Sequence, residues 1–236
     1  CNLLTEDILK LLVKAGLHSL TMSIEAGNDY IRNQIIKRHM TRKEILYAFD
    51  LCKKYRVATF VNSILAIPVK PEIMVAQKMK PIDYDVESLD MNIQTRPTFS
   101  EFVTMYPYPG CEFTEYVVGN GWFDPKDFGG LHSSCLGESP FNFFTPKEKM
   151  MQNNFALLGT ICVRFPWLRN ITVNYLIKLP LAKLYFIPYY LMMGYLNIFK
   201  VYPMKFTLAN LVRNILRSVK LEWKKRSPGK TLYKTT

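Results

Sequence analysis

Several features that would reveal a function directly are missing from this sequence of 236 residues. Its five cysteines stand at positions 1, 52, 111, 135 and 162, and no two have the spacing of a zinc knuckle or a redox pair. The odd number also argues against a secreted disulfide scaffold, so we expect a reducing cytoplasm. We find no nucleophile elbow, metal triad or phosphate-binding loop, and the three histidines are isolated.

The sequence also has no long uninterrupted apolar segment, and its C-terminal region has almost no acidic residues. The uncharged run 184–199 has 16 residues and contains Pro188 and Gly194, whereas a bilayer-spanning helix needs about 20 apolar residues. Residues 151–236 contain 14 Lys/Arg and a single acid, Glu222, a balance of +13. Residues 1–150 contain 17 Lys/Arg and 18 Asp/Glu, a balance of −1. The chain therefore has two regions of different composition.

Helix and strand patterns alternate through the first 125 residues. We predict helices over 3–17, 28–40, 41–55 and 111–122, and strands over 18–25, 57–68 and 100–110. Thr5 and Thr41 are the expected N-caps, the latter with Glu44 in a capping box. Residues 71–98 are expected to form a helix and then a loop that carries the acids at 83, 85, 87 and 90. The near-continuous apolar character of 57–68 indicates a strand buried on both faces, as in a parallel sheet.

This order of elements predicts an α/β fold, either a parallel barrel or an open sheet, with activity at the carboxyl ends of its strands. Three motifs appear in sequence: "AGLHSLTMSIEAGND", "IIKRHMTRKEILYAFDLCKKYRVATFVNSILAIP" and "YPYPGCEFTEYVVGNGWFD". Together they resemble the fourth to sixth strand segments of radical S-adenosylmethionine (radical SAM) enzymes. The closest likeness is to the branch that carries an upstream cobalamin-binding domain.

The resemblance implies a domain organisation. Residues 1–125 would be the C-terminal portion of a partial (β/α)6 radical SAM barrel. Residues 126–150 would be a connecting loop, and 151–236 a basic, aromatic-rich and mainly helical extension.

The resemblance also implies a set of residues that bind SAM. Ser23 and Glu25 would contact the ribose and the methionyl amine, with Gly27 allowing close approach of the backbone. Arg38 would grip the methionyl carboxylate. The remaining candidates are Asn62 for SAM or substrate, Ile67 and Pro68 against the adenine, and Ser63, Tyr106 and Tyr108 in the substrate cavity.

Several positions depart from the family pattern. The usual Gly-x-Pro is "AIP" at 66–68, the acidic segment after it is "VKP", and Cys111 stands where threonine is common. The C-x-x-x-C-x-x-C loop that holds the 4Fe–4S cluster is absent from these residues. In the family that loop precedes the first motif, and the chain starts at Cys1 rather than Met. We therefore expect a piece of a longer protein, inactive alone, with no metal ligands of its own.

Structural interpretations compete with the ligand roles. Glu25 could be an ordinary strand-end carboxylate or helix cap. Arg38 could be a solvated basic helix end that complements the helix dipole, and Asn62 could be a core asparagine whose hydrogen bonds are satisfied. Tyr106 and Tyr108 fit core packing and a rigid turn equally well.

The C-terminal region, 151–236, fits three interpretations. Its 14 aromatic and 14 basic residues suit a helix lying in a membrane interface, peripheral to the inner face of a membrane, with lysines reaching anionic headgroups. The same helices could instead pack on the open side of the barrel. The basic segment 213–230 could bind nucleic acid, but the apolar residues before it make lipid the better match.

The function implied by the resemblance is to position SAM for reductive cleavage and radical chemistry, either methylation or rearrangement. The implied cofactors are SAM, an upstream 4Fe–4S cluster and upstream cobalamin. The expected partners are an external electron donor and an apolar or lipid-linked small-molecule substrate. Two alternatives remain: a degenerate, non-catalytic, membrane-associated scaffold, and an unrelated hydrolase or aldolase-type barrel.

Overall fold

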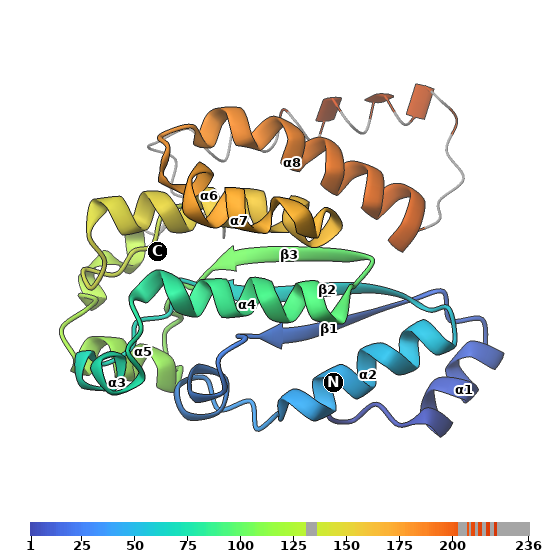
Figure 1. Cartoon of the computed structure of the whole chain (residues 1–236), viewed down its shortest axis with the longest axis horizontal. Coiled ribbons are helices and arrows are strands. Elements are labelled where there is room, and N and C mark those ends of the chain that lie inside the picture. Colours follow the sequence, from blue (N-terminus) through green and yellow to red (C-terminus); the bar gives the residue numbers. More distant parts are fainter. Residues whose placement is uncertain are drawn as a thin grey trace.

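The computed structural model describes residues 1–130, 136–202, 207, 209–210, 212–213, 216–217 and 220. Its centre is a parallel sheet of three strands in the order β1 (Ser19–Glu25), β2 (Ala58–Leu65) and β3 (Phe99–Thr104) (Figure 1). Ser23 on β1 pairs with Asn62 on β2, and Asn62 pairs with Glu101 on β3. The predicted α/β class and parallel strand order are confirmed.

Helices connect and follow these strands. The first set comprises α1 (Glu6–Lys14), the π-helical turn η1 (Ile31–Ile35), α2 (Arg42–Lys54), α3 (Pro71–Gln77), α4 (Pro81–Thr95), α5 (Glu112–Gly119) and η2 (Pro125–Gly130). The second set comprises α6 (Pro146–Arg164), η3 (Pro166–Leu168), α7 (Arg169–Asn174), η4 (Leu176–Lys178), α8 (Ala182–Leu196) and η5 (Asn197–Val201).

The predicted helix starts at Thr5 and Thr41 are confirmed. The Thr5 hydroxyl accepts a hydrogen bond from the Ile8 amide at 3.3 Å. At α2 the Glu44 amide donates to the Thr41 hydroxyl at 3.2 Å, and the Thr41 amide donates to the Glu44 carboxylate at 2.7 Å. These contacts satisfy backbone donors that a helix start otherwise leaves unpaired.

Helices cover one face of the sheet closely. Along β2 the buried residues alternate with half-buried ones, and Val61 and Leu65 point into the helical layer of α2, α4 and α6. The prediction that this strand is buried on both faces is wrong, because only the side chains on the helical side are fully covered. In Figure 1, α4 lies across β2, and α6 extends this layer beside β3.

The opposite face of the sheet is covered only in part. At the amino-terminal ends of the strands, Phe60 and Phe99 stack with ring centroids 5.0 Å apart and pack against Leu196 and Val201. The end of α8 and the following turn η5 therefore lie against this part of the sheet. Asn62, nearer the carboxyl ends, stays half-buried on the same face.

Two predicted elements differ from the structure. The helix over 28–40 is wrong: only the short turn η1 forms, and Lys37 and His39 adopt positive φ, which ends regular helical geometry. The loop expected after a helix in 71–98 is also wrong, because α4 carries all four acids. Pro81 at the first helical position, and the Lys80 amide bonded to Asp83 at 2.7 Å, start this helix.

Candidate functional site

The exits of β1, β2 and β3 surround a cavity of about 260 Å³. Its wall includes four of the residues predicted for SAM or substrate: Glu25, Arg38, Tyr106 and Tyr108. The remaining lining residues are Ile35, Ile36, Ile64, Met105, Cys111, Glu112 and Phe113. The carboxyl ends of parallel strands meet at one edge of a sheet, which is where ligands bind in many α/β proteins.

Glu25 reaches the cavity through an irregularity in β1. The pairing with β2 shifts between Ser23 and Glu25, as in a β-bulge, and Glu25 has a φ of 63°. The Ser23 hydroxyl stabilises this bend by accepting from the Glu25 amide and donating to the Asn62 carbonyl, both at 3.2 Å. Bulges re-aim side chains, and a positive φ on a non-glycine residue is costly. The hydrogen bonds of the Ser23 hydroxyl therefore stabilise the backbone conformation of Glu25.

The Glu25 carboxylate forms an ion pair with Arg38. Oε1 of Glu25 lies 2.6 Å from Nη2 of Arg38. The Glu25 side chain is only 7% exposed, whereas that of Arg38 is 55% exposed. The site thus places a buried anion behind a cation that remains in contact with solvent.

Arg32 holds the loop that carries Arg38. Its fully buried guanidinium donates to the Met40 carbonyl at 2.8 Å and to the Ala26 carbonyl at 2.7 Å, and it pairs with Asp29. The Arg38 amide donates to the Arg32 carbonyl at 2.9 Å. One side chain therefore joins both ends of the segment 26–40. Sequence reasoning missed Arg32, because the predicted helix over 28–40 gave no reason to expect a buried arginine.

The other wall of the cavity follows β3. Tyr106 is buried, and its hydroxyl donates to the Glu138 carbonyl at 3.1 Å. Tyr108 is exposed, and its carbonyl accepts from the Thr114 hydroxyl at 2.6 Å. Glu112, in the first turn of α5, forms an ion pair with Lys37 from the opposite loop. The loop after β1 and the start of α5 are thus connected beside the cavity.

Gly27 and Ser63, which are predicted to contact SAM and substrate, make contacts with α4. A Cβ built on Gly27 would lie 2.5 Å from the Ser88 nitrogen and closer still to the Glu87 carbonyl, so this glycine permits close packing on α4. Ser63 points to the helical side of the sheet, where its hydroxyl accepts from Asn92 at 2.8 Å. Neither residue lines the cavity.

The remaining predicted residues also lie outside the cavity wall. Ile67 and Pro68 are buried, Ile67 within an apolar cluster that includes Phe113, and the Pro68 carbonyl accepts from the Tyr116 hydroxyl at 3.2 Å. Asn62 lies on the half-covered face of the sheet. Its Oδ1 is buried and has no hydrogen-bond partner within the described part of the chain.

Asp85 on α4 is a buried carboxyl that the sequence did not single out. Oδ1 accepts from the Ala66 amide at 3.0 Å, at a residue with a φ of 59° in the turn after β2. Burial raises the pKa of Asp85 to about 7, and the hydrogen bond from Ala66 and the neighbouring Gln152 side chain partly offset this effect. Its Oδ2 has no hydrogen bond of ordinary geometry among the described residues. The sequence predicts a loop at Asp85 and therefore gives no reason to expect its burial.

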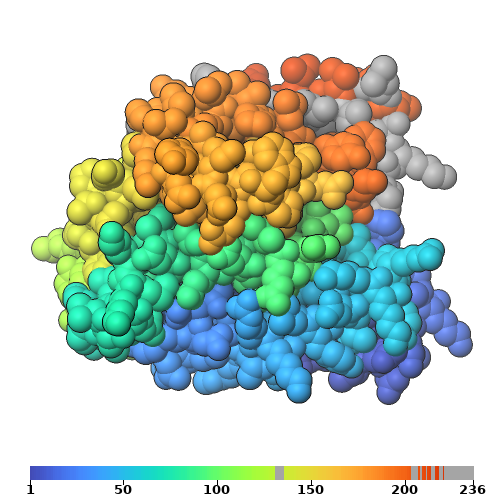
Figure 2. Space-filling model, viewed as in Figure 1, coloured from blue at the N-terminus to red at the C-terminus, as the bar shows by residue number. Residues whose placement is uncertain are grey.

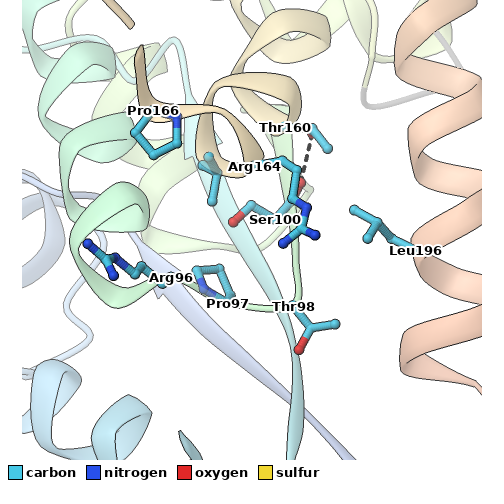
Figure 3. A pocket seen from close by; sticks show the side chains of 9 residues that line it. Arg96, Pro97, Thr98, Ser100, Thr160, Arg164, Pro166 and Leu196 are labelled. Atoms are coloured by element: carbon cyan, nitrogen blue, oxygen red, sulfur yellow. Dashed lines mark hydrogen bonds between the residues drawn. The ribbon is translucent and has the colours of Figure 1, made fainter. Parts of the chain in front are cut away.

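A second cavity of about 350 Å³ lies at the opposite, amino-terminal end of β3 (Figure 3). Its hydroxyls are already engaged: Thr160 donates to the Ser100 carbonyl at 2.7 Å, and Ser100 donates to Asn92 at 2.8 Å. Arg164 lies beside them in Figure 3, whereas the Arg96 guanidinium points away. Both arginines stand at helix C-termini, where a cation complements the helix dipole. This cavity is a weaker candidate than the first.

The described residues contain no group of three or more His, Cys, Asp or Glu side chains that could hold a metal ion. No protein-family model matches the chain, and a comparison with curated proteins finds no match either.

Proposed function

We propose that this chain forms the C-terminal part of a radical SAM barrel and that its strand-end cavity binds the methionyl end of SAM. The observation that carries the proposal is the Glu25–Arg38 pair, 2.6 Å apart at the tip of β1. A methionyl group has an ammonium and a carboxylate on one carbon. An anion and a cation held side by side complement that zwitterion, because each can exchange its partner for the opposite end of the ligand.

The size of the cavity fits a part of the ligand. Small-molecule pockets commonly measure roughly 300–1,000 Å³, and this cavity measures about 260 Å³. It would hold the amino-acid end, while the nucleoside end would extend beyond it. Tyr108 at the exposed side of the wall offers an aromatic surface for that end.

The arrangement of the sheet supports the barrel interpretation. Parallel barrels place helices on the outside of the sheet and polar side chains inside, at the carboxyl ends of the strands. Here α2, α4 and α6 cover one face. The other face is covered by the end of α8 and η5 only at the amino-terminal ends of the strands, and nearer the carboxyl ends it carries Asn62, whose Oδ1 has no partner among the described residues. That face would be the inner wall, and the Asn62 amide would find its partner in further strands or in SAM.

The other implied groups fit the described residues less well. SAM supplies a 5′-deoxyadenosyl radical when a reduced iron–sulfur cluster cleaves it, but the described residues offer no set of ligands for a cluster. The 4Fe–4S cluster, the cobalamin and the contact with an electron donor would therefore belong to other parts of the protein. What this chain would contribute is the grip of Glu25 and Arg38 on the amino-acid end, held rigid by Arg32.

Calorimetric titration of SAM into the complete protein tests the proposal. Glu25→Gln keeps the shape of the side chain and removes its charge. We expect affinity to fall by roughly ten- to a hundredfold, since hydrogen bonds to charged groups contribute about 1.5–3 kcal/mol. Glu6→Gln is the matched control, because Glu6 also forms an ion pair, with Lys54 at 2.7 Å, but lies on α1. Unchanged affinity in Glu25→Gln would refute the proposal.

A degenerate barrel that no longer binds SAM is the second candidate. The observation that favours it is Ala66, which takes a φ of 59° where the family has a glycine and is bonded to a buried aspartate. In that case the Glu25–Arg38 pair would be purely structural. No heat of SAM binding in the wild-type protein, together with a loss of stability in Glu25→Gln, would support the scaffold. Release of 5′-deoxyadenosine by the reduced complete protein would exclude it.

A further inference from the structure

The outer side of α8 carries a stripe of exposed apolar side chains. Leu184, Ile187, Leu191 and Tyr195 recur every three or four residues and are 57%, 57%, 69% and 49% exposed. This spacing places them along one side of a helix. Another side of α8 holds the buried residues of the helix: Tyr185 and Tyr189 pack toward α6, and Leu196 packs against Phe99 on β3. The helix is therefore apolar on both sides, although only one side is covered by the described residues.

The segments that flank α8 in the chain extend this apolar character. Exposed large apolar residues are concentrated in the segment 165–202. The described part of the preceding 164 residues is much longer and contains only seven. The members outside the α8 stripe are Phe165, Trp167, Ile171, Tyr175, Leu179, Leu181, Phe199 and Tyr202. Figure 2 shows the orange segment that contains α8 as the upper part of the molecular surface. Single exposed apolar residues are ordinary, but such a concentration marks an interaction surface.

The charge of the same segment has one sign. No Asp or Glu occurs between Glu148 and Glu222. Lys178, Lys183 and Lys200 are exposed, and none of them forms an ion pair within the described part of the chain. The surface around α8 therefore combines apolar side chains with cations that form no ion pair with the residues that the structure describes.

We propose that α8 lies in the interfacial layer of an anionic phospholipid membrane, with Leu184, Ile187, Leu191 and Tyr195 among the acyl chains. Lys178, Lys183 and Lys200 would reach the phosphates of the headgroups along their own apolar stems. Because the stripe runs along one side of α8, the helix would lie parallel to the membrane plane. No helix in the described ranges is both long enough and apolar enough to cross a bilayer.

A membrane fits this surface better than a second copy of the chain does. A two-fold interface through α8 would bring the same surface together twice. The lysines of one copy would then face the segment 149–221 of the other, which has no acid to receive them. Anionic headgroups supply the missing charge, and acyl chains cover the stripe without needing a shape-matched groove. This inference does not depend on SAM binding, because the strand-end cavity and the stripe have no residue in common.

Vesicle flotation with the complete protein tests the proposal. The probes are vesicles of phosphatidylcholine alone and vesicles that also contain roughly one quarter phosphatidylglycerol. We expect the wild-type protein to float with the anionic vesicles. Leu184→Ser combined with Leu191→Ser should reduce partitioning at least about tenfold, because two side chains lose their transfer from water into the apolar layer.

Two further variants separate the contributions. Leu11→Ser is the matched control, because Leu11 on α1 is 69% exposed, as is Leu191; its partitioning should equal that of the wild type. Lys183→Gln should reduce partitioning into anionic vesicles about fivefold, since each basic residue near such a surface contributes about one kcal/mol.

Three results would overturn the proposal. The first is equal flotation of the wild-type protein and the double leucine variant, with circular dichroism showing both folded. The second is equal partitioning into neutral and anionic vesicles. The third is a dimer in sedimentation without lipid that the double leucine substitution dissociates, which would assign the stripe to a second copy of this chain.

Discussion

Replacing Asp85 by asparagine should remove a large part of the pH dependence of folding stability above about pH 4. The Asp85 side chain is buried between α4 and the turn after β2, and burial raises its pKa from 3.8 to about 7. In the unfolded chain it would ionise at its ordinary pKa. Between these two values the folded protein holds one proton more than the unfolded chain.

The sign and size of the effect follow from that difference. Stability falls with rising pH wherever the folded state binds more protons. The contribution of Asp85 is therefore complete below about pH 4 and is lost by the time the pH passes about 7. A shift of about three pKa units at 1.36 kcal/mol each corresponds to a loss of about 4 kcal/mol in the free energy of unfolding.

The asparagine variant keeps the contacts that matter for packing. Its side-chain oxygen can still accept from the Ala66 amide, as Oδ1 does now at 3.0 Å. Its amide group can donate to the neighbouring Gln152 side chain. Asp85→Asn should therefore fold and should show no titration of its own.

The free energy of unfolding, measured with urea at pH 5, 6, 7 and roughly 8, tests the prediction. The difference in unfolding free energy between Asp85→Asn and the wild type should increase with pH, because all other groups are common to both proteins and cancel. Asp50→Asn is the control, because it removes a carboxylate that is exposed on α2 and leaves Asp85 in place. Parallel curves for the wild type and Asp85→Asn would refute the reasoning.

Two further substitutions test the surroundings of the cavity. Gly27→Ala should destabilise the fold by about 1–3 kcal/mol in urea unfolding, because its methyl group would overlap the backbone at Glu87. Gly119→Ala is the control: a Cβ built on Gly119 meets no atom within 4 Å, so this substitution should be neutral or stabilising. Equal stability of both variants would show that Gly27 has no packing role. Arg32→Gln should destabilise by about 3 kcal/mol or more and increase hydrogen exchange of amides 26–40, since buried carbonyls lose their donor. Unchanged exchange would show that this loop does not depend on Arg32.

Features that depend on a few neighbouring residues were predictable. The N-caps at Thr5 and Thr41 were predicted from side chains that bond to backbone groups two or three positions later, and both are confirmed. The strands around Ser23, Asn62 and Phe102 were predicted from their apolar patterns. The parallel order followed, because helical segments separate these strands along the chain.

Features that depend on distant partners were not predictable. The segment 28–40 has a helical pattern, but the buried Arg32 bonds to carbonyls at both of its ends and the chain leaves helical geometry. The acids at 83–90 resembled a solvated loop. In the structure they lie on α4, where Asp85 is buried under α6, and no property of the segment alone indicates that contact.

The candidate site divides in the same way. Glu25 and Tyr106 were expected at strand ends and do line one cavity, because parallel strands bring their carboxyl ends together. The side of the sheet to which a strand residue points depends on register, which is a property of the assembled sheet. The sequence therefore predicts Ser63 in the cavity, whereas in the structure its hydroxyl faces α4.

By itself, the sequence determined the α/β class, the helix starts, the parallel strand order and the separation of a balanced region from a basic one. These are consequences of periodicity, capping and charge, which act over a few residues. Only the tertiary structure decided that Glu25 pairs with Arg38, that Gly27 serves packing, and that Asp85 is buried. It also decided that one side of α8 is left uncovered by the described residues. Each of these is set by segments that are distant in the chain and meet only after folding.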